Sequence, residues 1–459
     1  MHSRIRRRHF LSAAGAGAVP VLWSTSAFPL TTRRPKVAAI FTVFRFRSHA
    51  FNILENFLGP YYFCGGLTDP GVDVVSFFAD QFPHDDMARE VSQRFGIPLY
   101  DSIDQALCLG GDRLAVDAVL SIGEHGDYPY NEFGQHMYPR KQFFDESMAV
   151  MHRSNRYVPF FNDKHLSYRW DWSKEMFHTA RRHNMPFMAG SSVPLAQRHT
   201  NLTIPQGAEI EEAVSIHGGG LESYDFHAFE VLQSFVECRA GGETGIAEVQ
   251  LLTGDEFIRA GQSGRWSQDL VDAAMAAEEA MQAERQTRPA TGVFSKTPSR
   301  VQTTVKPKLR RPSGSYAICI TYNDGLRATV LRLGGNADRW NFAWRLRGTS
   351  KPQATALFNG PWGNRCLFKA LSHAIRHMFK TGREPYPAER TLLTTAAVDA
   401  VIKSWNQNGK PVSMSDHDIP YQPADFTAFR ESGATWSVIT KDVLQSAGFG
   451  PRQFADVNR

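Results

Sequence analysis

The sequence has few cysteines and little excess charge. Its 459 residues include five widely scattered cysteines, in which neither a disulfide framework nor a zinc-binding spacing can be recognised. The formal net charge is only +5, and part of it lies near the N-terminus, so the composition indicates no nucleic-acid partner. Hydrophobic residues make up 42% and charged residues 21%, as in ordinary globular proteins, and the length is sufficient for two domains.

The N-terminal segment lacks an apolar run long enough to span a membrane. Residues 11–23 are only weakly apolar and rich in Gly and Ala, whereas a spanning helix needs about 20 apolar residues. The pair Arg7-Arg8 precedes this run, and small residues at 25–27 form a cleavage site. The pattern looks like a bacterial twin-arginine export signal. It predicts residues 1–34 to be a signal peptide with a short linker, the twin-arginine translocase to be a partner during export, and the mature protein to be periplasmic or secreted.

The sequence also lacks the glycines of a dinucleotide-binding turn. Residues 36–44 are predicted to form a buried strand, which Gly-x-Gly-x-x-Gly would normally follow so that the backbone can approach a pyrophosphate. The segment 41–46 reads Phe-Thr-Val-Phe-Arg-Phe instead. Arg45 and Ser48 could still bind a phosphate at the start of the next helix. Alternatively, this loop and the helix simply pack against the sheet.

Three ionisable residues follow another predicted strand. The apolar run 157–161 is typical of a buried strand, and Asp163, Lys164 and His165 come at its carboxyl end, before an amphipathic helix. Further strands are predicted before and after this unit, so the pattern indicates a parallel sheet. Ligands bind at the carboxyl ends of the strands of such sheets. The alternative is that Asp163 and Lys164 form a solvated turn.

The arrangement resembles the Gfo/Idh/MocA oxidoreductases, whose Rossmann domain carries a Glu-Lys-Pro motif at the end of its fifth strand. Asp163-Lys164-His165 falls on that motif, with Asp for Glu and His for Pro. The resemblance implies that Lys164 hydrogen-bonds the substrate hydroxyl being oxidised and touches the nicotinamide ribose, with Asp163 beside it in the catalytic site and His165 among the substrate-binding residues. It covers about residues 35–415.

The resemblance also implies a fold of the α/β class in two domains. We expect an N-terminal Rossmann-type parallel sheet and a C-terminal α+β domain with an open, mostly antiparallel sheet. The second domain is also expected to support a homo-oligomer. The predicted segments are 1–34 for the signal and linker, 35–190 for the Rossmann-like domain, 191–415 for the α+β domain and 416–459 for a C-terminal extension.

A bound nicotinamide, NAD or NADP, is a further expectation from the resemblance. Asp80 follows the strand predicted over 72–79, where the fold places an acidic residue that can hold the adenosine ribose hydroxyls. Together with Arg45 and Ser48 it forms the predicted cofactor-binding set. An aspartate in this place can also be only a helix cap.

The loop after the strand predicted over 114–122 carries Glu124, His125 and Asp127. Loops at strand ends often carry chemistry, and Gly126 and Pro129 favour a loop here. The three residues are a substrate-binding cluster, an incipient metal site or a salt-bridged surface loop. We assign them to the substrate and predict no metal ligands, because one loop without a partner is a weak metal signature.

The second domain contributes one further candidate. Its Gly-Gly-Gly turn at 218–220 is followed by a helix predicted over 224–238, and His227 falls on the histidine that the family uses as general acid or base. The preceding aspartate of the family has no clean match, so either Glu222 or Asp225 could orient the imidazole. The alternative is that His227 is a packed helix residue.

These patterns lead to one prediction with two alternatives. We expect an exported oxidoreductase-like protein acting on a sugar or cyclitol hydroxyl by nicotinamide-dependent hydride transfer, in which Lys164 polarises the hydroxyl and His227 exchanges its proton. The first alternative is a cofactor-free lyase, isomerase or hydrolase on sugar derivatives, with or without the assistance of a metal ion. The second is a periplasmic sugar-binding protein without turnover.

Overall fold

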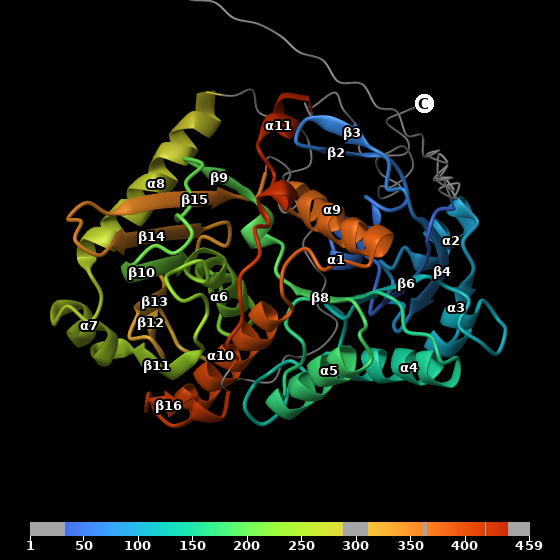
Figure 1. Ribbon diagram of the computed structural model, residues 1–459, viewed down its shortest axis with the longest axis horizontal. Helices are drawn as coiled ribbons and strands as arrows, with labels where there is room; N and C mark the ends of the chain where they lie inside the picture. The colour runs from blue at the N-terminus through green and yellow to red at the C-terminus, as the bar shows by residue number, and fades with distance from the viewer. Residues whose placement is uncertain (1–32, 288–310, 361–364, 418, 439–459) are drawn as a thin grey trace, which may run out of the picture. The chain divides into compact units, whose positions relative to one another are not determined.

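A parallel sheet of six strands forms the first part of the fold (Figure 1). The computed structural model describes residues 33–287, 311–360, 365–417 and 419–438. The strands lie in the order β5-β4-β1-β6-β7-β8, which is the doubly wound order 3-2-1-4-5-6. Their bounds are β1 Lys36–Phe41, β4 Asp73–Ala79, β5 Leu99–Tyr100, β6 Ala118–Ile122, β7 Phe160–Asp163 and β8 Phe187–Gly190.

Burial on both faces explains why these short apolar runs form a parallel sheet. The residues of β6 and β8 are all buried, as are those of β1 except Lys36. In the view of Figure 1, helices α4 (Arg140–Arg153) and α5 (Trp170–Arg182) lie below the sheet, and α1 (His49–Leu54) and α9 (Arg365–Thr381) lie above it.

The second sheet has eight strands in the order β16-β11-β12-β13-β10-β14-β15-β9. All neighbouring strands are antiparallel except β10 and β13, which pair in parallel. The predicted fold class is therefore confirmed. The bounds are β9 Gln197–His199, β10 Ile210–His217, β11 Ile246–Thr253, β12 Tyr316–Tyr322, β13 Arg327–Arg332, β14 Trp340–Leu346, β15 Gln353–Phe358 and β16 Val412–Ser413.

The remaining elements connect and cover the sheets. A hairpin of β2 and β3 was not predicted; among the described residues it forms a sheet of its own. No described helix is both long and apolar enough to cross a membrane. The bounds are β2 Tyr61–Phe63, β3 Gly66–Thr68, α2 Ala88–Phe95, α3 Ile103–Cys108, α6 Ser223–Val236, α7 Gly254–Gln262, α8 Gln268–Thr287, α10 Glu389–Asn406, α11 Ala434–Val438, and the 3-10 turns η1 Val193–Leu195, η3 Ser415–His417 and η4 Thr427–Phe429.

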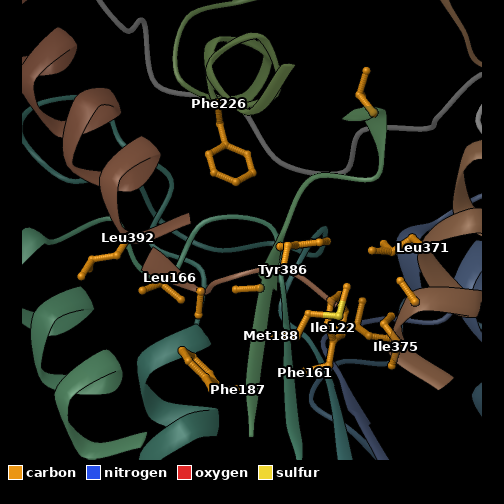
Figure 2. Packing of buried hydrophobic residues seen from close by; sticks show 14 of the residues in the cluster. Ile122, Phe161, Leu166, Phe187, Met188, Phe226, Leu371, Ile375, Tyr386 and Leu392 are labelled. Carbon is orange, nitrogen blue, oxygen red and sulfur yellow. The ribbon is translucent and has the colours of Figure 1, made fainter. Parts of the chain in front are cut away.

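One apolar cluster joins the parallel sheet to the second sheet through α6, α9 and α10. Figure 2 shows Ile122 and Phe161 of the parallel sheet beside Ile375 of α9, while Phe226 points from α6 toward the strands. On β10, Ala213 belongs to this cluster, whereas Val214 and Ile216 pack into a separate cluster under α8. The second sheet is therefore buried on both faces. The strand ends of the parallel sheet meet α6 across a packed interior.

The C-terminal residues that the structure describes pack against the same chain. Tyr421 is buried, and its hydroxyl donates to Glu237 Oε2 at 2.7 Å. Glu431 accepts the amide of Cys64 in the β2–β3 hairpin at 3.1 Å. Residues 1–32, which hold nearly all of the predicted export signal, lie outside the described residues, and the predicted domain boundaries stay predictions.

Candidate active site

Lys164 occupies a constrained position directly after β7. Its backbone has φ 65°, in the left-handed region that residues other than Gly rarely adopt. Its carbonyl accepts the Gly190 amide at 3.1 Å, in an isolated antiparallel bridge at the end of the parallel strands β7 and β8. A Cβ on Gly190 would lie only 2.8 Å from oxygens of Glu230 and Thr391, so only glycine fits there. The fold thus sets the direction of the Lys164 side chain.

The ammonium of Lys164 lies between a carboxylate and a hydroxyl. Nζ is 3.1 Å from Glu124 Oε1 and donates to Ser223 Oγ at 3.2 Å. Glu124 follows β6, and Ser223 begins α6, so three separate segments meet at this nitrogen. Lys164 and Glu124 are buried, whereas Ser223 is partly exposed. We call Lys164, Glu124, Arg140, His165 and His227 the Lys164 cluster.

Arg140, at the start of α4, balances the remaining charge of Glu124. Its guanidinium forms an ion pair with Glu124 Oε2, and its NH1 lies 3.1 Å from His165 Nε2. Burial raises the pKa of Glu124, but the positive charges of Lys164 and Arg140 outweigh burial and hold this pKa well below its ordinary value. Burial and the charge of Arg140 lower the pKa of His165, so its imidazole is neutral. Glu124 is therefore a carboxylate shared by two cations.

His227 reaches the same place from α6. Its Nδ1 lies 2.6 Å from Ser191 Oγ, which follows β8. Burial, followed by the positive charges of Lys164 and His49, lowers the pKa of His227 well below its ordinary value. The imidazole is therefore neutral at pH 7. Because Ser191 holds Nδ1, Nε2 is the ring nitrogen that can exchange a proton with a ligand.

The expectation that Glu222 or Asp225 orients His227 is wrong, because Ser191 does so. Asp225 instead accepts the Glu222 amide at 2.7 Å and the Tyr316 hydroxyl at 2.8 Å. Glu222 accepts the His136 amide at 3.4 Å, and burial raises its pKa to about 7. Both carboxylates therefore form hydrogen bonds with the backbone at the start of α6 or with neighbouring residues.

Asp163 and His125 lie in a second polar group beside the cluster. Asp163 Oδ2 is 2.6 Å from Nδ1 of His49, the first residue of α1, and the His49 amide donates to His125 Nδ1 at 3.4 Å. Burial and the charge of His49 lower the pKa of His125 well below its ordinary value. The Asp127 side chain is exposed, away from these contacts. Among the described residues no three His, Cys, Asp or Glu side chains converge as a metal site would require.

The predicted cofactor residues lie at the ends of β1 and β4. Ser48 Oγ accepts the amides of Phe51 and Arg45, each at 3.2 Å, and so caps α1. Asp80 accepts the hydroxyl of Tyr128 from the loop after β6. The side chains of Ser48 and Asp80 therefore take part in contacts within the turn and across the sheet edge.

A bridge closes this part of the sheet edge. Gln81 Nε2 donates to the Asp127 carbonyl at 3.0 Å, and the Asp127 amide donates to Gln81 Oε1 at 2.8 Å. Gln81 follows β4 and Asp127 follows β6, and β1 lies between those two strands. With the contact between Asp80 and Tyr128, this Gln81–Asp127 bridge passes over the end of β1. Phe44, in the turn after β1, is fully buried and packs edge-on against Phe41.

Sequence reasoning missed Arg140, His49, Ser191 and Ser223 as members of the site. Arg140 could have been found, because it follows the Glu124 loop closely in the sequence and could neutralise a carboxylate there. His49 directly follows Ser48, which was predicted to bind a phosphate. Ser191 and Ser223 carry no local signal, because only the pairing of distant segments brings them to the site.

Solved structures of inositol dehydrogenases and related oxidoreductases share this fold. The scyllo-inositol dehydrogenase from Lactobacillus casei with bound NAD(H) and scyllo-inositol matches at TM-score 0.51 and 11% identity, over 83% of this chain and 100% of that chain. GenD2 from gentamicin A biosynthesis, in complex with NAD, matches at TM-score 0.52 and 11% identity, over 88% and 99%. At these identities the likeness establishes the fold alone. No protein-family model and no curated protein sequence matches the chain.

The turn between β1 and α1 does not fit a dinucleotide as it stands. A pyrophosphate binds such a turn through backbone amides and a close approach that glycines permit. Here the amide of Phe44 donates to Asp86 Oδ2 at 2.7 Å, and the amide of Ser48 donates to the Arg45 carbonyl at 2.9 Å. The amides of Arg45, His49 and Phe51 are also engaged within the chain. Five amide donors in and after this turn are therefore already engaged within the chain.

Proposed function

We propose that this chain acts on a sugar or a cyclitol at the Lys164 cluster, and that it moves protons rather than hydride. The reaction class is isomerisation or elimination on a sugar derivative. One observation carries the proposal: the Lys164 ammonium is fixed 3.2 Å from a serine hydroxyl and 3.1 Å from a carboxylate at the strand end where this fold binds ligands. Ser223 Oγ stands where a substrate oxygen would accept the same hydrogen bond.

The chemistry follows from the two nitrogen groups. Lys164 donates to the substrate oxygen that gains negative charge when a neighbouring proton leaves, and so stabilises the transition state. His227, neutral at pH 7, takes that proton at Nε2 and returns it to another atom of the substrate. Glu124 keeps the ammonium in place, since one of its oxygens pairs with Lys164 and the other with Arg140. No redox partner is needed, because no electrons leave the substrate.

A polyhydroxylated substrate suits the loop between Glu124 and Arg140. Tyr130 stacks on His136 at 4.4 Å between ring centroids, and His136 lies 4.0 Å from Tyr138. The guanidinium of Arg140 lies 5.0 Å from the Tyr138 ring centroid, so this aromatic row adjoins the cluster. Aromatic faces beside charged hydrogen-bonding groups form pockets that accept rings with both apolar and hydroxyl faces. The inositol bound in a structure of the same fold supports this substrate class.

Nicotinamide-dependent hydride transfer is the second candidate. The fold favours it, since neighbouring structures hold NAD(H). The residues of the β1–α1 turn oppose it, because its amides are engaged and the Gln81–Asp127 bridge passes over it. Hydride transfer to NAD or NADP would require that bridge to open.

Proton exchange in heavy water separates the candidates. The protein is incubated in D2O with a panel of aldoses, ketoses, uronic acids and cyclitols, and carbon-bound deuterium is followed by NMR, with and without NAD or NADP. We expect exchange without any nicotinamide and its loss in Lys164→Met. Turnover only with a nicotinamide, or release of one near one per chain from protein purified with its export signal, would establish hydride transfer instead. Sugar binding without exchange would make the chain a binding protein.

We also propose that the protein is exported in folded form to the periplasm or beyond. The paired arginines Arg7 and Arg8 ahead of a short apolar run support this. Replacing both by Lys is expected to leave the protein in the cytoplasm, because the translocase receptor recognises the arginine pair. Arg4→Lys is the matched control and is expected to be exported. Unchanged periplasmic yield of the double variant, measured by cell fractionation, would refute the assignment.

A further inference from the structure

A cavity lies between β9, α6 and the segment 423–430, which contains η4. Its volume is about 430 Å³, within the range of small-molecule sites. It shares no residue with the Lys164 cluster. Part of its wall is apolar, formed by Ile204, Pro205, Phe235 and Phe426 among others. The rest of the wall contains two buried arginines, Arg198 and Arg430.

Arg198, on β9, is buried with an incompletely paired guanidinium. Only 7% of it is exposed, and its guanidinium carbon lies 3.7 Å from the centroid of the Phe235 ring. NH1 donates to the Leu202 carbonyl at 3.0 Å, whereas Nε is buried and has no hydrogen-bond partner in the part of the chain that the structure describes. Burial and the nearby charges of Arg430 and Arg390 lower the pKa of Arg198 well below its ordinary value. No carboxylate among the described residues forms an ion pair with it.

Arg430 presents the same situation from the C-terminal segment. It is 8% exposed, and both Nε and NH1 are buried without a hydrogen-bond partner among the described residues. The two acids in the cavity wall do not pair with it. Glu237 is bound by Arg390 and by the Tyr421 hydroxyl, and Asp425 accepts the Thr427 amide at 2.8 Å. Burial lowers the pKa of Arg430, and Asp425 only partly offsets this.

We propose that this cavity binds a small organic anion, a carboxylate or a phosphate monoester with an apolar portion. A buried guanidinium without a counter-charge is unfavourable, and two of them in one cavity wall compound the cost. An anion between them would accept the hydrogen bonds that Arg198 Nε and Arg430 Nε and NH1 do not make within the chain. Phe235, stacked on Arg198, and the neighbouring prolines would cover the apolar portion.

The test is calorimetric titration of the whole chain with inorganic phosphate, phenyl phosphate and benzoate at fixed ionic strength. We expect one saturable site per chain, with phenyl phosphate or benzoate binding more tightly than inorganic phosphate because the ring meets the apolar wall. The better of the two aromatic probes identifies the charged group that the site prefers. Arg430→Met is expected to weaken that binding by about tenfold or more, the size of a lost charge-assisted hydrogen bond.

A second measurement keeps the proposal falsifiable. Because Arg430 is unpaired without ligand, Arg430→Met is expected to raise the melting temperature in anion-free buffer and to abolish the further rise that the probe gives the parent. The exposed Arg94→Gln is the control and should behave as the parent. If Arg430→Met does not fold, Arg198→Lys, which keeps the charge but loses Nε, must still weaken binding. No binding of any probe, or equal affinity in the variants, overturns the proposal.

Discussion

The two halves of the carboxyl edge of the parallel sheet have opposite characters. At β4, β1 and the near side of β6, hydrogen bonds between loops and a buried Phe44 close the edge. At β6, β7 and β8, the same edge gathers Glu124, Lys164 and Ser191, which face His227 of α6. In this first half, the closed half, polar groups of the loops after β4 and β6 form hydrogen bonds with one another. The second half, the open half, carries ionisable side chains placed to donate and accept protons.

The two halves of one sheet edge can therefore differ in role within the same fold. In a doubly wound sheet the crevice beside β1 serves a nucleotide, and the strand ends beyond it serve the second ligand. Here Phe44 of the β1 half is packed in the interior, while the β7 half presents a lysine in a constrained backbone position. A substitution in the first half should therefore affect stability, and one in the second half should affect turnover.

The largest expected effect tests the closed half. Phe44→Ala is expected to lower the free energy of unfolding by about 3–5 kcal/mol, because it leaves a cavity beside Phe41 in the closed half. Urea unfolding measures this loss. Phe133→Ala is the matched control; Phe133 is 48% exposed, so its truncation should change little. Full stability with lost turnover in Phe44→Ala would break the comparison, since it would place a functional residue in the closed half.

The sequence predicted the fold well because its signals were local. The apolar runs at 36–44, 72–79, 114–122 and 157–161 predicted four strands of the parallel sheet, which are β1, β4, β6 and β7. The bounds shifted by a few residues, as at β7, which includes Asp163 itself. The short edge strands β9 and β16 were missed because two or three residues carry no period.

The site was only partly predictable, because its contacts are not local. The contact of Lys164 with Glu124 follows from the strand order, since adjacent parallel strands end at one edge. The choice of Ser191 rather than Glu222 or Asp225 as the partner of His227 depends on how α6 packs against β8. No spacing in the sequence contains that packing. Likewise, the missing glycines showed that the turn after β1 was unusual, but they did not show which contacts its residues make.

The next expected effect tests the open half. Lys164→Met keeps most of the apolar stem and removes the charged donor, so turnover should fall by about a hundredfold or more, or roughly 2–4 kcal/mol in transition-state free energy. Steady-state kinetics on the substrate found in the exchange assay measure this loss, and urea unfolding checks the fold. The exposed Lys410→Met is the control. Parent-like turnover in Lys164→Met would remove the lysine from the mechanism.

The smallest expected effect concerns Glu222, which borders the open half at the start of α6. Burial raises the pKa of Glu222 from its ordinary 4.5 to about 7, although Arg311, 3.7 Å away, opposes this. Between these two pH values the folded state therefore holds a proton that the unfolded chain releases. The stabilising contribution is complete below pH 4.5, decreases as the pH rises toward 7 and is lost above it.

Glu222→Gln removes this titration while keeping a carbonyl oxygen that can accept the His136 amide. Between pH 5 and pH 8 the parent should lose about 1–3 kcal/mol more unfolding free energy than the variant, a value that corresponds to a shift of one to two pKa units. Urea unfolding at both pH values measures the difference, and the exposed Glu132→Gln should follow the parent. If the parent and Glu222→Gln lose equal stability, Glu222 is already ionised at pH 5. The ionised side chains of the open half would then include Glu222 at the start of α6. The two halves would differ in charge by more than the burial of Glu222 implies.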